Sequence, residues 1–162
     1  MTSPADRPRV VFDCNVLIQA IANDAGPSGT ALRHLQRNLI EVFVSRPILK
    51  ELRAVLNYPK VRQKLPGLQD DRIEVFIQQL LFRATFLREV PHIFNYPRAK
   101  QDEPYVDLAA VARADCLVSR DRDLLSLMTD HSVAGKQFRQ RCPRLRVLSP
   151  VEFLASVPAP PS

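Results

Sequence analysis

Short apolar runs rich in β-branched residues alternate with longer stretches of helical periodicity along most of this 162-residue chain. Strands that alternate with helices are typical of a parallel sheet with helices on its faces. We therefore predict an α/β fold, a three-layer sandwich with a central parallel sheet of about four to five strands flanked by helices. The predicted strands are residues 9–12, 40–44, 86–90, 116–118 and 145–148. The predicted helices are 15–22, 30–37, 48–56, 71–85, a helix from Asp102, and 121–128, with helical turns at 61–65 and 150–154.

The remaining segments are predicted to be loops. Residues 24–29 contain Gly and Pro, residues 91–101 contain two prolines, and residues 129–144 are polar and basic. The length suits one compact domain, which we place at residues 1–156. The Pro-rich residues 157–162 are predicted to be a disordered tail.

Composition excludes several classes of protein. The chain is 46% hydrophobic and 25% charged, and no apolar run is long enough to span a membrane. The polar N-terminus lacks the apolar core of a signal peptide. Three widely spaced cysteines fit a reduced, cytoplasmic protein better than a disulfide scaffold, and no Cys/His spacing suggests zinc. The three scattered histidines are interpreted as non-catalytic.

Acidic residues stand beside apolar segments at well-separated places in the chain. Asp13 follows the first predicted strand, and Asp121 follows the fourth. Because ligands of parallel sheets bind at the carboxyl ends of the strands, both acids are expected at one edge of the sheet. Carboxylates in such positions are costly to bury unless a cation compensates them. The pattern favours a site for Mg²⁺ or Mn²⁺, with Glu51, Asp102 and Asp123 as further candidates.

Three segments in order carry a resemblance to a known family. They are VFDCNVLI at 11–18, SRPILKELRAVLNYPK at 45–60 and DEPYVDLAAVARADCLVSRDRDLL at 102–125. With these motifs, residues 9–154 resemble the PIN domain, and most closely its branch of toxin components of toxin–antitoxin systems. The resemblance implies a Mg²⁺- or Mn²⁺-dependent endoribonuclease that hydrolyses single-stranded RNA. It further implies a small antitoxin protein as a possible partner, and we expect a homodimer.

The resemblance also assigns roles to residues. It implies that Asp13, Glu51, Asp102 and Asp121 are catalytic, and that Asp13, Asp102, Asp121 and Asp123 bind the metal. Asn15 is the polar partner in the first motif, and Ser119 replaces a commoner Thr. The pair Ala99-Lys100 stands where the family often has Asp-Pro, so no further ligand is expected there.

The formal net charge of +6 is spread over several basic stretches. A basic surface around an acidic pocket is expected of a nuclease, since the surrounding positive field holds the phosphate backbone. We predict that Arg46, Lys136, Arg139 and Arg141 contact nucleic acid. A solvated basic surface without this role is the alternative interpretation.

Other interpretations stay open at this point. Asp13 could cap a strand end, Glu51 could face solvent, Asp121 could be only a helix N-cap, and Asp107 could replace Asp102. The alternative function is a nucleic-acid-binding PIN-fold module with weak or no catalysis. A phosphatase that uses an aspartate after the first strand is disfavoured, because Asn15 stands where such enzymes usually have a second Asp.

Overall fold

The computed structural model describes residues 6–157. The tail predicted to be disordered lies, apart from Val157, outside the described residues. Five strands form a single sheet in the order β3-β2-β1-β4-β5, and every neighbouring pair is parallel. The strands are β1 Arg9–Phe12, β2 Glu41–Ser45, β3 Thr85–Leu87, β4 Cys116–Val118 and β5 Arg146–Leu148. The predicted α/β fold is therefore confirmed, with β1 in the centre of the sheet.

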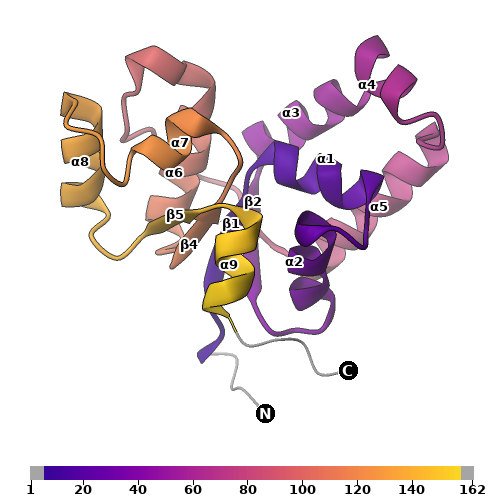
Figure 1. The fold of residues 1–162 in the computed structure, drawn as a ribbon, viewed down its shortest axis with the longest axis horizontal. Helices are drawn as coiled ribbons and strands as arrows, with labels where there is room; N and C mark the ends of the chain where they lie inside the picture. Colours follow the sequence, from indigo (N-terminus) through magenta and orange to yellow (C-terminus); the bar gives the residue numbers. More distant parts are fainter. Residues whose placement is uncertain (1–5, 158–162) are drawn as a thin grey trace.

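Helices flank this sheet on both sides (Figure 1). Helix α6 packs across β1, β2 and β4, while α9 packs on β4, β5 and α2. Figure 1 shows α6, α7 and α8 on one side and α1 to α5 on the other. The helices are α1 Cys14–Ala22, α2 Pro27–Gln36, α3 Arg46–Leu56, α4 Pro59–Lys64, α5 Asp70–Arg83, α6 Glu103–Val111, α7 Arg122–Ser126, α8 Val133–Arg141 and α9 Pro150–Ser156, and a 3₁₀ segment, η2, spans Pro97–Asp102. In the described part of the chain, no helix is long and apolar enough to cross a membrane.

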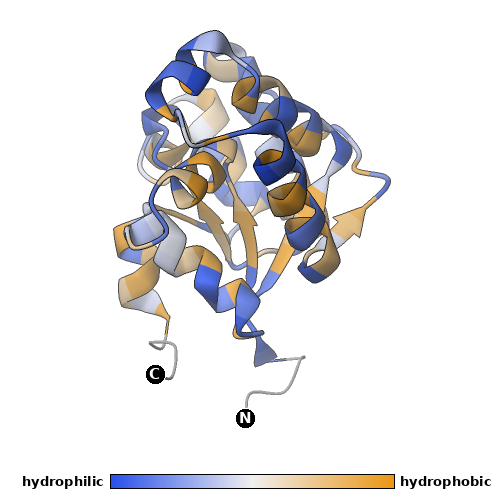
Figure 2. Ribbon diagram, turned by 90° about the vertical axis from the view of Figure 1, so that its right-hand side faces the viewer, coloured by the Kyte–Doolittle hydropathy of each residue, from blue (hydrophilic) through white to orange (hydrophobic). Residues whose placement is uncertain are grey.

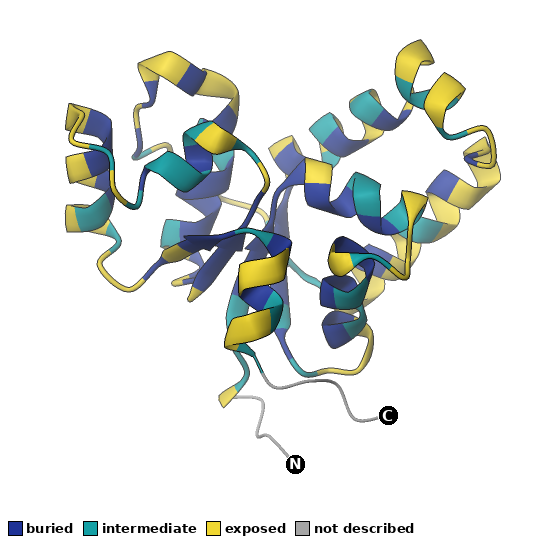
Figure 3. Cartoon of the chain, viewed as in Figure 1, coloured by how far each residue is buried: buried dark blue, intermediate teal, exposed yellow. Residues whose placement is uncertain are grey.

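The core follows the strands. In β1 and β4 the residues from Val10 to Phe12 and from Cys116 to Val118 are all buried. Figure 2 shows these central strands as hydrophobic, and Figure 3 shows them as the most buried part of the molecule. Strands buried on both faces are expected to be continuously apolar, as these are. The polar groups buried at the end of this core, notably Asp13, Asp102 and Ser119, are therefore exceptions that need a reason.

The prediction that residues 129–144 form a loop is wrong, because most of them form α8. Ser132 caps this helix by accepting a hydrogen bond from the Gly135 N–H at 3.1 Å. Ala134 and Phe138, four residues apart, are buried, and the Phe138 ring packs against Phe94 with the ring centroids 6.2 Å apart. The other positions are mostly polar and exposed, so only this narrow apolar stripe marks the helix in the sequence.

Two glycines suggested loops in the sequence at places where helices begin in the structure. Helix α2 begins at Pro27, inside the predicted loop 24–29, and Gly29 lies in its first turn. A Cβ at Gly29 would lie 2.3 Å from the Asp24 carbonyl oxygen, and one at Gly135 would lie 2.5 Å from the Asp130 carbonyl oxygen. In both helices glycine is present because the preceding loop folds back onto the first turn. Glycine here reflects close approach of the backbone, although in sequence it suggests a break.

Gly135→Ala is expected to lower the free energy of unfolding by about 1–3 kcal/mol, as overpacking of a tight site does. Gly67→Ala is the matched control, since the nearest atom to a Cβ there is Arg72 Nη1 at 3.6 Å. Denaturant unfolding of both variants in EDTA measures the difference. Equal stability of the two variants would contradict the close approach of α8 to Asp130.

Candidate metal centre

The parallel pairing of β1 and β4 brings the first and fourth acidic motifs together. Asp13 follows β1, and its backbone N–H donates to the Val118 carbonyl at 2.9 Å. The Ser119 hydroxyl, fully buried after β4, donates to Asp13 Oδ2 at 2.6 Å. The same hydroxyl accepts from the Asp121 N–H at 2.9 Å. Ser119 therefore connects the two strand ends through these two hydrogen bonds.

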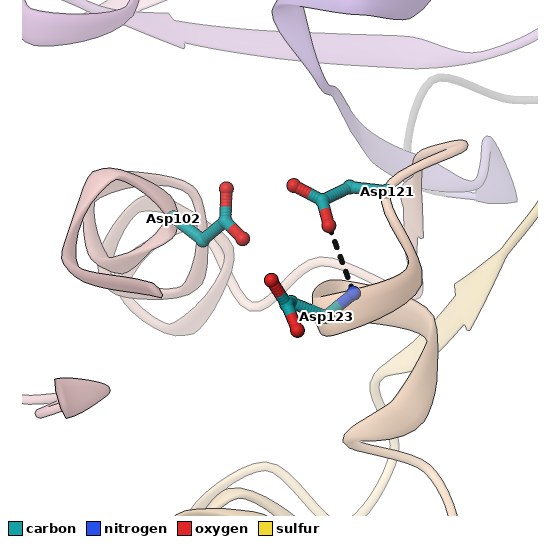
Figure 4. Close-up of side chains that lie close together, drawn as sticks. All are labelled: Asp102, Asp121 and Asp123. Atoms are coloured by element: carbon teal, nitrogen blue, oxygen red, sulfur yellow. Dashed lines mark hydrogen bonds between the residues drawn. The ribbon is translucent and has the colours of Figure 1, made fainter. Parts of the chain in front are cut away.

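Asp121 is the N-cap of α7. Its Oδ1 accepts from the Asp123 N–H at 2.8 Å, as the N-cap interpretation anticipated. The other carboxylate oxygen of Asp121 points toward Asp102 (Figure 4). One short helix turn thus positions two acids, Asp121 and Asp123, at the carboxyl edge of the sheet.

Asp102 completes a group that we call the carboxylate cluster, made of Asp102, Asp121 and Asp123. One carboxylate oxygen from each residue lies within 4.8 Å of the other two. Asp102 stands at the junction of η2 and α6, and only 3% of it is exposed. Its Oδ2 is buried and has no hydrogen-bond partner among the described residues. A buried carboxylate oxygen without a donor is the ligand that a hard divalent cation would complete, so these residues fit Mg²⁺ or Mn²⁺.

The electrostatics of the cluster agree with this fit. Burial, followed by the charge of Asp121, a side-chain hydrogen bond with Asp121 and the charges of Asp13 and Asp123, together raise the pKa of Asp102 to about 8. Without a cation, Asp102 therefore holds a proton near neutral pH. A divalent ion would replace that proton, because it stabilises the ionised form of the carboxyl group.

Asp13 and Glu51 form a second acidic pair beside the cluster. Burial raises the pKa of Asp13, and so does the charge of Asp121, whereas hydrogen bonds from Ser119 and from the Asn15 and Cys14 backbone lower it. Glu51 lies half-buried on α3, and its pKa is raised by burial and by Asp13. Neither Asp13 nor Glu51 belongs to the carboxylate cluster, although both were predicted to be catalytic and Asp13 to bind the metal. The Asn15 side chain is exposed, so what this residue contributes at Asp13 is its backbone N–H.

Tyr105 is a residue whose role here the sequence did not indicate. Its hydroxyl accepts from the Cys14 N–H at 3.2 Å and hydrogen-bonds to the Glu51 carboxylate, which lowers the pKa of Glu51. Tyr105 is fully buried on α6. It links α6, α3 and the first turn of α1, and thereby orients Glu51 next to Asp13. An apolar stripe containing one tyrosine carries no signal for such a contact.

Asp107, the alternative to Asp102, makes its hydrogen bonds away from the carboxylate cluster. Its carboxylate accepts from the backbone N–H groups of Ile93 and Phe94 at 3.0 and 2.9 Å and pairs with His92 at 2.9 Å. These contacts fasten the segment before η2 to α6. Asp107 is thus a structural acid, and the position that faces the other carboxylates is Asp102.

The residues predicted to contact nucleic acid differ in their surroundings. Arg46, at the first position of α3, and Lys136 and Arg141, on α8, are exposed. Arg139 instead donates to the carbonyl oxygens of Leu127 and Asp130, both at 2.7 Å. Its guanidinium holds the connection between α7 and α8, so a change at Arg139 would test the fold as much as the binding of RNA.

Comparison with known proteins agrees with the geometry. The family model described as PIN domain matches residues 9–123. This chain belongs to the PIN domain family. The chain is also similar to uncharacterized protein MJ1680 of Methanocaldococcus jannaschii, with 27% identity over 146 residues that cover 90% of this chain and 89% of that protein. PIN domains are typically metal-dependent nucleases, and the carboxylate cluster of this member could hold a metal ion.

Asp102→Asn is expected to stabilise the metal-free protein at high pH. The pKa of Asp102 is about 8 in the folded chain against 3.8 for an ordinary aspartate, so the stability gained from its proton is complete below about pH 4 and is lost as the pH rises through about 8. Asn does not titrate, and the advantage of the variant should therefore grow across this window. Relief of about 2 kcal/mol would raise the Tm by roughly 4–8 °C.

Thermal unfolding in EDTA at pH 4.5 and pH 8.5 measures this effect, with the exposed Asp24→Asn as a matched control outside the cluster. A lower Tm of Asp102→Asn at pH 8.5 would mean that this carboxylate is a structural hydrogen-bonding group.

Proposed function

We propose that the protein is a metal-dependent endoribonuclease that hydrolyses single-stranded RNA, and that it is the toxin of a toxin–antitoxin pair. The observation that carries the nuclease proposal is the carboxylate cluster with the unpartnered, buried Asp102 Oδ2. Three acids from two separate segments converge there, and their repulsion has no structural benefit unless a cation binds. Membership of the PIN family supports the same activity.

The residues divide the work in this proposal. Asp102 and Asp121 hold the ion, with Asp123 beside them, and a bound Mg²⁺ or Mn²⁺ would activate water and neutralise the phosphate oxygens. Asp13 is held by Ser119 and by the N–H groups at the beginning of α1. In this proposal Glu51, which lies next to Asp13 and is hydrogen-bonded to Tyr105, orients the attacking water. The exposed Arg46, Lys136 and Arg141 hold the phosphate backbone of the RNA.

The toxin assignment and the partners follow from the resemblance of the sequence. A small antitoxin encoded beside this gene and a homodimer of the chain are part of the proposal. Expression of the protein should arrest bacterial growth, and co-expression of the neighbouring small reading frame should restore it. Growth arrest that persists in Asp121→Asn would disconnect toxicity from the nuclease site. Light scattering of the purified protein measures its oligomeric state.

RNA cleavage is expected to require Mg²⁺ or Mn²⁺, to stop in EDTA and to leave 5′-phosphate and 3′-hydroxyl ends. Asp121→Asn should lower the cleavage rate at least about 100-fold while the metal-free protein stays as stable as the wild type, since Asn keeps the oxygen that caps α7. Product analysis on a labelled single-stranded RNA and melting in EDTA measure both. Undiminished cleavage in EDTA would rule out the metal mechanism, and RNA binding without cleavage would favour a binding module.

RNA affinity, measured with Asp121→Asn, is expected to fall steeply with salt. Three or four neutralised phosphates would give a slope of log K against log salt of roughly −2 to −3 for a single strand. Lys136→Ala with Arg141→Ala should flatten this slope and leave metal affinity unchanged. Arg139 is excluded from this test because it holds the fold together. An unchanged slope would make the exposed face of α8 a solvated surface, and the contacts would then come from Arg33, Arg37, Arg46 or the loop 98–100.

A further inference from the structure

A fixed cation already stands at the rim of the carboxylate cluster. Arg98, on η2, forms an ion pair with Asp123 in which its Nε lies 3.1 Å from Asp123 Oδ1. Both side chains are partly open to solvent, with 54% of Arg98 and 38% of Asp123 exposed. In the sequence, residues 98–100 were one of the basic stretches within the predicted loop 91–101, and nothing there indicated that Arg98 lies beside the acidic site.

The Arg98 guanidinium is held in place by several further contacts. Its Nη2 donates to the Tyr96 hydroxyl at 2.7 Å and to the Ser126 hydroxyl at 2.9 Å. Both hydroxyls donate in turn to the Asp123 carbonyl oxygen, at 2.7 and 2.8 Å. Asp130 Oδ2 lies 3.5 Å from the same Nη2. Through these two hydroxyls the guanidinium is linked to the backbone of Asp123, whose carboxylate it also pairs with. A freely moving surface arginine lacks such contacts.

The Arg98 cation already occupies one carboxylate oxygen of the cluster. Its Nε lies 3.1 Å from Asp123 Oδ1, so this oxygen faces a fixed positive charge before any metal ion binds. Arginine stays protonated at any physiological pH, so its charge cannot be removed to make room for another ion. Two-metal centres place their ions about 4 Å apart and share carboxylates between them. A second ion bound through Asp123 would therefore face the Arg98 guanidinium on the same carboxylate.

We propose that Arg98 is a positioning residue that occupies the Asp123 carboxylate with its own positive charge, so that the carboxylate cluster takes one divalent ion rather than two. The inference rests on the proposed metal site and deepens it. Asp102 and Asp121 are then the direct ligands, and Asp123 is held at the rim by Arg98. The number of ions bound thus depends on a residue outside the acidic motifs.

Titration of metal-stripped protein with Mn²⁺ in a calorimeter tests the proposal without reference to activity. The wild type should bind one Mn²⁺ per chain, and Arg98→Met should bind two. Arg122→Met is the matched control, because Arg122 is exposed between Asp121 and Asp123 and makes no ion pair within residues 6–157. It should bind one ion like the wild type. Two ions in the wild type, one in Arg98→Met, or two in Arg122→Met would each overturn the proposal.

Asp123→Asn tests the same ion pair by removing the charge of its acidic partner, and this test does not depend on the folding of Arg98→Met. This variant should still bind one Mn²⁺, with affinity lowered less than about tenfold, and adding Arg98→Met to it should not create a second site. Loss of Mn²⁺ binding in Asp123→Asn alone would overturn the proposal, because Asp123 would then be an essential ligand of the single ion. A wild type that binds no Mn²⁺ would instead refute the proposed metal site itself.

Melting in EDTA provides a second readout. Arg98→Met should lower the Tm of the metal-free protein more in the wild-type background than in the Asp123→Asn background, since only the first loses an ion pair with Asp123. Equal losses in both backgrounds would show that Arg98 acts through Tyr96 and Ser126 alone, and would overturn its role at the cluster.

Discussion

Repulsion between carboxylates gathered at one edge of the sheet is the constraint on which the candidate site depends. The pairing of β4 beside β1 brings Asp13 and Asp121 together, and the η2–α6 junction adds Asp102 from the side. The fold compensates part of this charge with the Ser119 hydroxyl, the Asp123 N–H and the Arg98 guanidinium. Asp102 Oδ2 is left without a hydrogen-bond donor, and a divalent cation would compensate this uncompensated charge.

The acids fall into two groups with different surroundings. Asp102, Asp121 and Asp123 approach one another closely enough to share an ion, whereas Asp13 and Glu51 are tied to hydrogen-bond donors from Ser119 and Tyr105. Charge interactions connect the groups, because Asp13 raises the pKa of both Asp102 and Glu51. In the proposed nuclease, the first group holds the cation and the second orients water, so the two tasks are carried by neighbouring but distinct sets of contacts.

Local patterns in the sequence predicted what depends on local structure. Strand ends at Asp13 and Asp121 could be located because buried parallel strands are continuously apolar and end at polar residues. Helix α8 was missed because its buried face is narrow, and the beginning of α2 was missed because Gly29 suggests a break while serving a close backbone approach. Tyr105 and Arg98 could not be found, since each acts through contacts with residues far apart in the chain, which no periodicity encodes.

The hydrogen bonds of Ser119 and Asp121 have a consequence for how this region can vary in length. Between Val118 and Asp123 three hydrogen bonds fix the course of the chain. The Ser119 hydroxyl donates to Asp13 and accepts from the Asp121 N–H, and the Asp121 carboxylate accepts from the Asp123 N–H. An insertion or deletion of one residue here would rotate at least one carboxylate away and leave the Ser119 hydroxyl without one partner. The segment 118–123 therefore works as a spacer whose length is fixed by the hydrogen bonds that aim the acids.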